Sequence, residues 1–282
     1  MTPFADDDFN DWIGRARTQE DVISLTSARA LAATLDRDPA SIAVGDPLPA
    51  GWHWASFPPL TRRSELGADG IEARGSFLPP VPLPRRMWAG GRLRFPGVVR
   101  IGERATRTST IESVRSKEGR SGPLVFVTVR HRVEGSTGVA VDEEQDLVFR
   151  EVARPAGGGS AGGATPADFP PGAADWSEAF TADEVTLFRF SALTFNGHRI
   201  HYDRPYVTAV EGYPGVVVHG PLIALLLLDA AVRNAGGTPA LFAYRAVAPL
   251  FCGERFLIEG RGDRVAAIHP ERGVAMEASV ER

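Results

Sequence analysis

Asn196, His198, His201 and Asp203 lie close together in the segment Phe190–Asp203, which reads F-S-A-L-T-F-N-G-H-R-I-H-Y-D. An imidazole has a pKa near neutrality, so it can both accept and return a proton. A neighbouring amide or carboxylate can position a water molecule or the ring itself. The segment is therefore predicted to be a catalytic loop in which His201 is the acid/base group and Asn196 holds a water molecule.

A second segment, V-V-V-H-G-P at Val216–Pro221, leads into a long apolar stretch at Leu222–Val232. Pro221 suits the first turn of a helix, and the apolar stretch predicts a buried helix that ends at two glycines, 236 and 237. The amide of Gly220 would then lie at a helix N-terminus, where backbone N–H groups favour negative charge. Together the two segments indicate an enzyme that acts on an activated carbonyl.

Each of these side chains also has a purely structural interpretation. His201 could be a hydrogen-bonded core histidine, and Asn196 a left-handed turn residue before the following glycine. His198 could lie at the surface, and Asp203 could either orient His201 or sit in a turn. His219 is expected to brace the glycine turn through its side chain. The pattern H-x-x-H-x-D offers metal ligands, but no further ligand cluster accompanies it, and we expect no metal.

Composition narrows the class of protein. Hydrophobic residues make up 43% and charged residues 23% of 282 residues, and the net charge is −4. This balance is typical of a soluble globular protein and favours neither nucleic acid nor an anionic membrane as a partner. A single cysteine, Cys252, excludes a disulfide within the chain. The acidic start of the sequence does not resemble a secretory leader, so we expect a cytoplasmic protein.

The chain is expected to contain two units. Residues 154–174 are rich in glycine, alanine and proline and form a predicted linker between residues 1–153 and 175–282. Each unit is predicted to place a helix before a run of antiparallel strands, with helix starts capped near Thr26 and Thr181. Residues 1–24 carry no predicted element, and the prolines of residues 77–91 argue against a strand there. The fold class is α+β.

The loop ending in N-G-H-R-I-H-Y-D, followed by V-V-V-H-G-P-L, resembles the MaoC-like hydratases and dehydratases, which have the hotdog fold. Within them the chain is most similar to the hydroxyacyl-thioester dehydratase group, which includes the mesaconyl-C4-CoA (3-methylfumaryl-CoA) hydratases. The matching segment covers about residues 185–222, and P-R-R-M-W-A-G-G at Pro84–Gly91 also resembles this group. The resemblance implies a double hotdog, with two antiparallel sheets that each wrap around a helix.

The family motif G-D-x-N-P-x-H places His201 at its catalytic histidine and Gly220 at the glycine whose N–H contacts the thioester oxygen. The family's aspartate corresponds to Asn196, which cannot take up a proton. The two-residue acid/base scheme therefore cannot be copied unchanged. Arg85, Arg86, Arg92 and Arg94 are candidates for binding coenzyme A phosphates or a substrate carboxylate, or else form a solvated strand face. Trp88 is a candidate for lining the acyl pocket.

The predicted function is hydration or dehydration of an α,β-unsaturated acyl-CoA, with a short branched dicarboxylyl-CoA such as mesaconyl-C4-CoA or itaconyl-CoA favoured by the resemblance. The alternatives are a 3-hydroxyacyl-thioester dehydratase of fatty acid synthesis, a hotdog thioesterase and a non-catalytic acyl-thioester binding module. No cofactor is expected, because coenzyme A is part of the substrate. One active site per chain is expected where the two units meet, and a homodimer of double hotdogs is left open.

Overall fold

The computed structural model describes residues 6–119, 122–151 and 174–282. The strands are β1 Ala16–Val22, β2 Arg85–Arg94, β3 Arg104–Gly119, β4 Gly122–Gly135, β5 Gly138–Arg150, β6 Trp176–Thr181, β7 Leu241–Ala246, β8 Arg255–Arg261, β9 Arg264–His269 and β10 Gly273–Glu281. The α-helices are α1 Leu25–Thr34, α2 Glu184–Thr194, α3 Arg204–Ala209 and α4 Gly220–Ala235. Short 3-10 helices are η1 Asp6–Trp12, η2 Pro39–Ser41, η3 Trp52–Ala55, η4 Arg63–Glu65 and η5 Arg199–His201.

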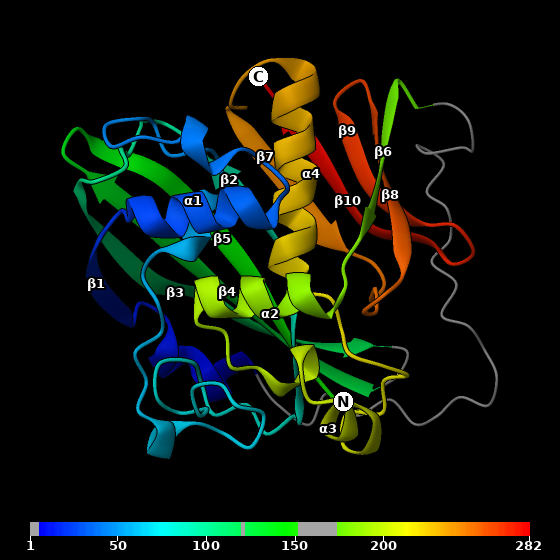
Figure 1. The fold of residues 1–282 in the computed structure, drawn as a ribbon. Helices are drawn as coiled ribbons and strands as arrows, with labels where there is room; N and C mark the ends of the chain where they lie inside the picture. Colours follow the sequence, from blue (N-terminus) through cyan, green and yellow to red (C-terminus); the bar gives the residue numbers. More distant parts are fainter. Residues whose placement is uncertain (1–5, 120–121, 152–173) are drawn as a thin grey trace.

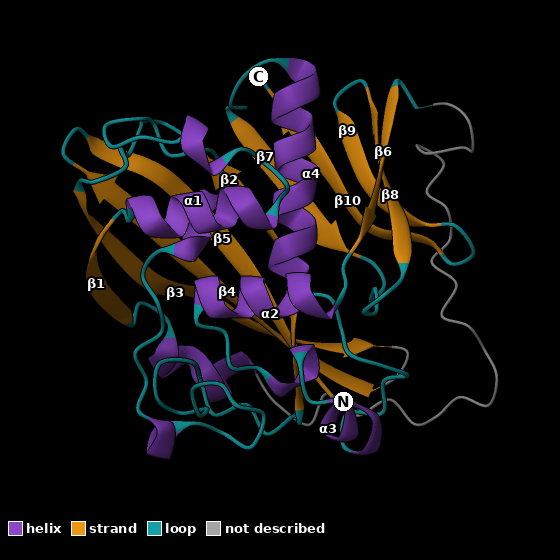
Figure 2. Cartoon of the chain, viewed as in Figure 1, coloured by secondary structure: helices purple, strands orange, loops and turns teal. Residues whose placement is uncertain are grey.

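The described strands form one antiparallel sheet in the order β1-β3-β4-β5-β2-β7-β10-β9-β8-β6. The two expected sheets are therefore joined edge to edge, because β2 of the first half pairs with β7 of the second. This pairing runs from Gly90 opposite Arg245 to Arg94 opposite Leu241. Figure 2 shows α1, α2 and α4 on one side of the continuous sheet. The α+β double hotdog predicted from the sequence is confirmed, with a single shared sheet.

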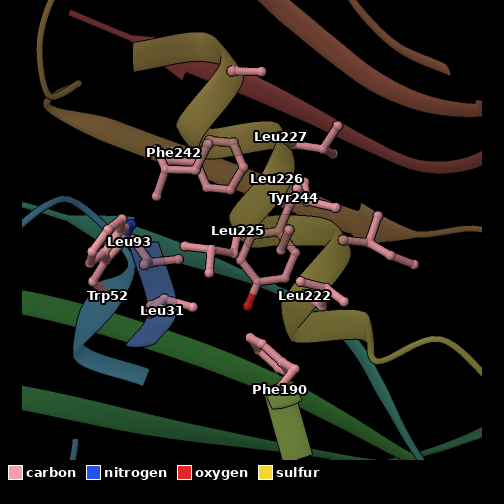
Figure 3. Packing of buried hydrophobic residues seen from close by; sticks show 14 of the residues in the cluster. Leu31, Trp52, Leu93, Phe190, Leu222, Leu225, Leu226, Leu227, Phe242 and Tyr244 are labelled. Atoms are coloured by element: carbon pink, nitrogen blue, oxygen red, sulfur yellow. The ribbon is translucent and has the colours of Figure 1, made fainter. Parts of the chain in front are cut away.

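Helix α4 lies at the centre of the fold, across the strands of the second half (Figure 1). Its leucines from Leu222 to Leu228 are almost completely buried. Burying one leucine side chain stabilises a fold by about 2 kcal/mol, so this helix anchors the core. Figure 3 shows Leu31, Trp52 and Leu93 of the first half packed towards Leu222, Leu225 and Leu226. One hydrophobic core thus extends across both halves.

The ends of α4 match the sequence prediction. Pro221 occupies its first turn, and Gly236 closes it in a left-handed conformation with φ 76°. Two other predicted helix starts are shifted. The cap of α1 is Ser24, whose side chain accepts from the amide of Ser27, and the cap of α2 is Asp183, which accepts from that of Thr186. These side chains, and not Thr26 or Thr181, satisfy the free amides of the first turn.

β1 was not predicted, and of β2 only the residues after Gly91 were expected to form a strand. β1 lies within the polar N-terminal region, and β2 lies in the proline-rich segment that argued against a strand. Its prolines end before Arg85, so β2 keeps its backbone donors and pairs with strands on both sides, β5 and β7. The predicted linker lies outside the described residues except for Ala174, so the division into two domains remains a prediction. None of the described helices is long and apolar enough to cross a lipid bilayer.

The seam between the two halves offers a test of the packing. Gly91 lies opposite Tyr244 at this seam, and a Cβ added there would lie 2.5 Å from the carbonyl oxygen of Glu144 and would overlap the Tyr244 hydroxyl. We predict that Gly91→Ala lowers the free energy of unfolding by about 1–3 kcal/mol, measured by urea denaturation. Gly215→Ala is the control, because nothing lies within 4 Å of its added Cβ. Equal stability of the two variants would contradict the described seam.

Candidate active site

His201 is held in one tautomer by the backbone. It lies at the end of η5, is 7% exposed, and its Nδ1 is 2.8 Å from the carbonyl oxygen of Val217. A carbonyl oxygen only accepts hydrogen bonds, so Nδ1 carries the proton and donates. The Nε2 lone pair is then left to accept a proton, as a general base requires.

The surroundings of His201 keep its ring neutral. Burial and, to a smaller extent, His198 lower its pKa to about 3, while the hydrogen bond to Val217 acts in the opposite direction. Because this pKa is below the ordinary imidazole value, the ring is unprotonated near neutral pH. The Nε2 lone pair therefore carries no proton near neutral pH, and the protonated ring would be a strong acid that readily returns its proton.

The ring of His219 packs against the ring of His201. Its ring is completely buried and stacks on the His201 ring, with centroids 3.7 Å apart and planes at 20°. Its Nε2 lies 2.8 Å from the hydroxyl of Ser191 on α2. Burial also lowers the pKa of His219 well below its usual value, and the neighbouring His201 adds to this effect. The predicted bracing role agrees with these contacts.

The start of α4 presents Gly220 to the same site. His219 is the N-cap residue, and no side chain caps the helix. Pro221 has no N–H, so the Gly220 amide is the first donor of this helix. A Cβ on Gly220 would lie 2.8 Å from Cε3 of Trp88, which comes from β2 of the other half. Glycine is required here because the indole ring packs directly against the backbone.

A cavity of about 450 Å³ brings the predicted residues together. Its lining includes Asn196, His198, His201, Gly220 and Trp88. The remaining surface is mostly apolar, from β2, β5 and the segment after β7. Such a mostly apolar cavity with a few polar groups is typical of a small-molecule site. It is built from both halves of the chain, as expected.

A second cavity of about 880 Å³ adjoins the first. It lies between α2 and the segment of residues 59–72, and exposed aromatic side chains such as Phe188 and Phe195 line it. The residues that line both cavities are Ile71, Arg86, Gln145, Asn196 and Pro221. A long ligand lying across this boundary would place one end in each cavity.

Two hydrogen bonds hold Asn196 in the predicted catalytic loop. Its Oδ1 accepts from the backbone N–H of His198 at 3.0 Å, and its own N–H donates to the carbonyl of Ser191 at 2.8 Å. The left-handed residue in this loop is Phe195, with φ 50°, so the interpretation of Asn196 as the left-handed turn residue is wrong. The Asn196 side chain both shapes the turn and faces the two cavities.

His198 and Asp203 have different surroundings. The half-buried ring of His198 meets His201 edge-on, with centroids 5.5 Å apart. Burial lowers its pKa to about 3, and the positive charge of Arg86 contributes. The Asp203 carboxylate accepts from the guanidinium of Arg199 at 2.7 and 2.9 Å and from the amide of Tyr206 at 3.0 Å. It caps α3, while the carbonyl of Val217 orients His201.

The four candidate arginines differ in their surroundings. Arg85 is buried beside Glu211, 3.5 Å away, and above the Tyr213 ring, and it lines neither cavity. Arg92 pairs with Glu144 and Asp146, and Arg94 lies 3.7 Å from Glu144. These two form the solvated strand face considered as the alternative. Arg86 is the one of the four that lines the cavities.

Three groups at the candidate site were not predicted from the sequence. The Val217 carbonyl orients His201, the Ser191 hydroxyl contacts His219, and Gln145 of β5 lines both cavities. A backbone carbonyl leaves no signal in residue type, and Gln145 reaches the site only through long-range strand pairing. Across the residues that the structure describes, no group of three or more His, Cys, Asp or Glu side chains has a metal-binding arrangement.

Known proteins resemble this chain over most of its length. The family model for hydroxyacyl-thioester dehydratase type 2 matches residues 51–252. The mesaconyl-C(4)-CoA hydratase of Chloroflexus aurantiacus is 44% identical over 278 residues, which cover 97% of this chain and 98% of that protein.

Two solved structures share the fold. A MaoC-like dehydratase from Phytophthora capsici has a TM-score of 0.65 and 16% identity, covering 95% of this chain and 96% of its own. A conserved hypothetical protein from Mycobacterium tuberculosis, described as a double hotdog, has a TM-score of 0.54 and 17% identity, covering 99% and 98%. With the family match and the 44% identical relative, these findings establish that the chain belongs to the hydroxyacyl-thioester dehydratase type 2 family, with a double hotdog fold.

Proposed function

We propose that this protein is a hydro-lyase that adds water to the double bond of a short branched dicarboxylyl-CoA, and removes it in reverse. Mesaconyl-C4-CoA is the first candidate substrate and itaconyl-CoA the second. The observation that carries the proposal is that the free Nε2 of His201 and the helix-start amide of Gly220 belong to one cavity. The 44% identical relative named mesaconyl-C(4)-CoA hydratase supports this choice of substrate.

His201 moves the proton. In hydration, Nε2 takes a proton from water while the oxygen forms a bond with the β-carbon of the thioester. The electron pair of the double bond moves to the thioester carbonyl, which becomes an enolate. Because the low pKa of His201 makes its protonated ring a strong acid, it then delivers the same proton to the α-carbon. One group serving both steps adds water to a single face of the double bond.

Gly220 stabilises the enolate. Its N–H points out of an uncapped helix start, and the dipole of α4 adds partial positive charge there. Donors that are fixed before reaction stabilise developing negative charge without reorganisation. Trp88 packs against this glycine. The thioester carbonyl is therefore assigned to the space in front of Gly220.

Asn196 is assigned to the attacking water. Its Oδ1 already accepts one hydrogen bond, from the amide of His198, and an amide oxygen has two lone pairs. The second lone pair and the NH₂ group remain for a water molecule beside the β-carbon. In this assignment Asn196 positions water and His201 alone exchanges protons.

Three alternative functions use the same cavity differently. A 3-hydroxyacyl-thioester dehydratase of fatty acid synthesis would use the same chemistry on another acyl group, in line with the family description. A thioesterase needs a carboxylate beside the helix start, and no Asp or Glu among the described residues lines the cavity that contains Gly220. A non-catalytic binding module would not require the fixed tautomer of His201.

Incubation of the purified protein with mesaconyl-C4-CoA, itaconyl-CoA and crotonyl-CoA separates these functions. The products identify the reaction by mass, and release of free thiol would indicate a thioesterase. Absence of hydrated product with all three substrates would reject the proposed function. We further propose that no cofactor is needed, that the protein acts in the cytoplasm and that it forms a homodimer.

Replacement of the general base is the first prediction for activity. His201→Ala should lower kcat by about 10³-fold, because both proton transfers lose their carrier. His269→Ala is the control, since His269 lies at the end of β9 and lines neither cavity. Steady-state hydration assays measure both variants, with circular dichroism to check folding. Near-normal turnover of His201→Ala would reject the assigned base.

The pH dependence gives a second prediction for activity. Since burial lowers the pKa of His201 to about 3, its basic form is fully populated from about pH 5 to 8, and kcat/KM should be flat on the acidic side. In Asn196→Asp, a carboxylate near the ring favours the imidazolium and raises the pKa of His201, so an acidic limb should move into this range. A limb near the ordinary imidazole pKa in the unmodified protein would contradict the described environment of His201.

A further inference from the structure

Arg86 extends from β2 towards the reacting groups. It lies two positions before Trp88 on the same strand, and both residues pair regularly with β5, opposite Phe149 and Leu147. Residues two apart on a strand point to the same face and lie roughly 7 Å apart. Trp88 packs against Gly220 at the start of α4, and Arg86 is therefore the next residue on the same face of β2. Its side chain lines both cavities at their boundary.

The guanidinium of Arg86 forms no ion pair with a carboxylate among the residues that the structure describes. Among the described residues, no carboxylate oxygen lies within 4 Å of its guanidinium. Burial lowers the pKa of Arg86, and the charge of Arg74 acts in the same direction, while Asp69 and Glu72 act against them. Glu72 already pairs with Arg17 at 3.0 Å, and Asp69 accepts from the amide of Ile71 at 3.3 Å.

An uncompensated, partly desolvated guanidinium in a ligand cavity is costly unless a ligand supplies the negative charge. Here the cavity is mostly apolar, which strengthens the attraction between the guanidinium and any anion that enters. The planar fork of an arginine matches a carboxylate through two parallel hydrogen bonds. The geometry thus favours a carboxylate that lies close to the reacting carbons.

The anion must belong to the acyl group. With the thioester carbonyl at Gly220, the coenzyme A phosphates are separated from the reaction by the whole pantetheine arm. A carboxylate attached to the β-carbon lies only a few bonds from the thioester and stays within the region shared by Gly220, Asn196 and Arg86. The other candidate arginines do not line this region.

We propose that Arg86 binds the free carboxylate of the acyl group and thereby selects dicarboxylyl thioesters over uncharged ones. This inference rests on the proposed hydration at His201 and names the residue that determines its substrate class. The ion pair also neutralises a negative charge that would otherwise repel the enolate formed in the reaction. Arg86 is thus a specificity-determining residue, and it exchanges no proton.

Paired substrates test the proposal. 3-Methylcrotonyl-CoA has a methyl group where mesaconyl-C4-CoA has its carboxylate. We expect Arg86→Gln to lower kcat/KM for mesaconyl-C4-CoA by about 100-fold, and to change that for 3-methylcrotonyl-CoA and crotonyl-CoA by less than about 3-fold. Arg86→Lys keeps the charge but loses the fork, so an intermediate loss is expected. Arg94→Gln, on the same strand but outside both cavities, is the control.

A binding measurement separates this inference from the proposed function. Succinyl-CoA and butyryl-CoA lack a double bond, and of the two only succinyl-CoA has a free acyl carboxylate. Isothermal titration should show tighter binding of succinyl-CoA than butyryl-CoA to the unmodified protein, and this preference should disappear in Arg86→Gln. An unchanged preference in the variant, or an equal loss of kcat/KM for all substrates, would overturn the role of Arg86. Failure to hydrate any substrate would instead reject the hydratase function while the titration still tests Arg86.

Discussion

The hydrogen bond from His201 to the carbonyl of Val217 is the contact on which the active site depends. The carbonyl is itself fixed, because the amide of Val217 donates to Ile200 and that of Val218 donates to Leu250. The segment before α4 therefore forms hydrogen bonds with the loop that contains His201 and with the segment between β7 and β8. His201 and the start of α4 share this support, so the separation of the proposed proton-transfer group and helix-start donor is set by backbone hydrogen bonds.

Different elements cover the sheet in the two halves of the fold. In the second half, the leucines of α4 cover the sheet. In the first half, the short helix η3 lies over the sheet, and its His53 pairs with Glu143 of β5 at 3.0 Å. Burial raises the pKa of Glu143, but the hydrogen bond and charge of His53 outweigh this, so the pKa lies below its usual value. His53, Trp54 and Glu143 thus form a polar cluster around the buried Glu143 carboxylate in the first half.

Local patterns in the sequence predicted the parts of the site that are local in structure. The helix α4, its glycine end and the loop with His198 and His201 were predicted because spacing along the chain decides them. β1 was missed because its residues between Ala16 and Val22 are all polar, with no apolar alternation to indicate an edge strand. The first part of β2 was missed because the prolines of residues 77–91 argued against a strand there.

Long-range strand pairing determines which side chains face the cavities, and local sequence patterns do not predict it. Arg85 and Arg86 are neighbours of the same type, yet one packs on Tyr213 and the other enters the cavities. Which of them faces the site depends on the register of β2 against β5, and no pattern within the segment fixes that register. The roles of Asp203 and Asn196 likewise depended on which backbone groups came near them after folding.

The pairing of β2 with β7 also affects how the two parts of the site could be exchanged between related proteins during evolution. The histidine and the helix start come from the second half, while Trp88 and Arg86 come from the first, across a seam of five residue pairs from Gly90 to Arg94. A duplicated or separately encoded second half would carry the proposed proton-transfer group but not Trp88 and Arg86, which line the cavity from the first half. Exchange of first halves between related proteins is therefore a direct route by which substrate range can change while the reaction is kept.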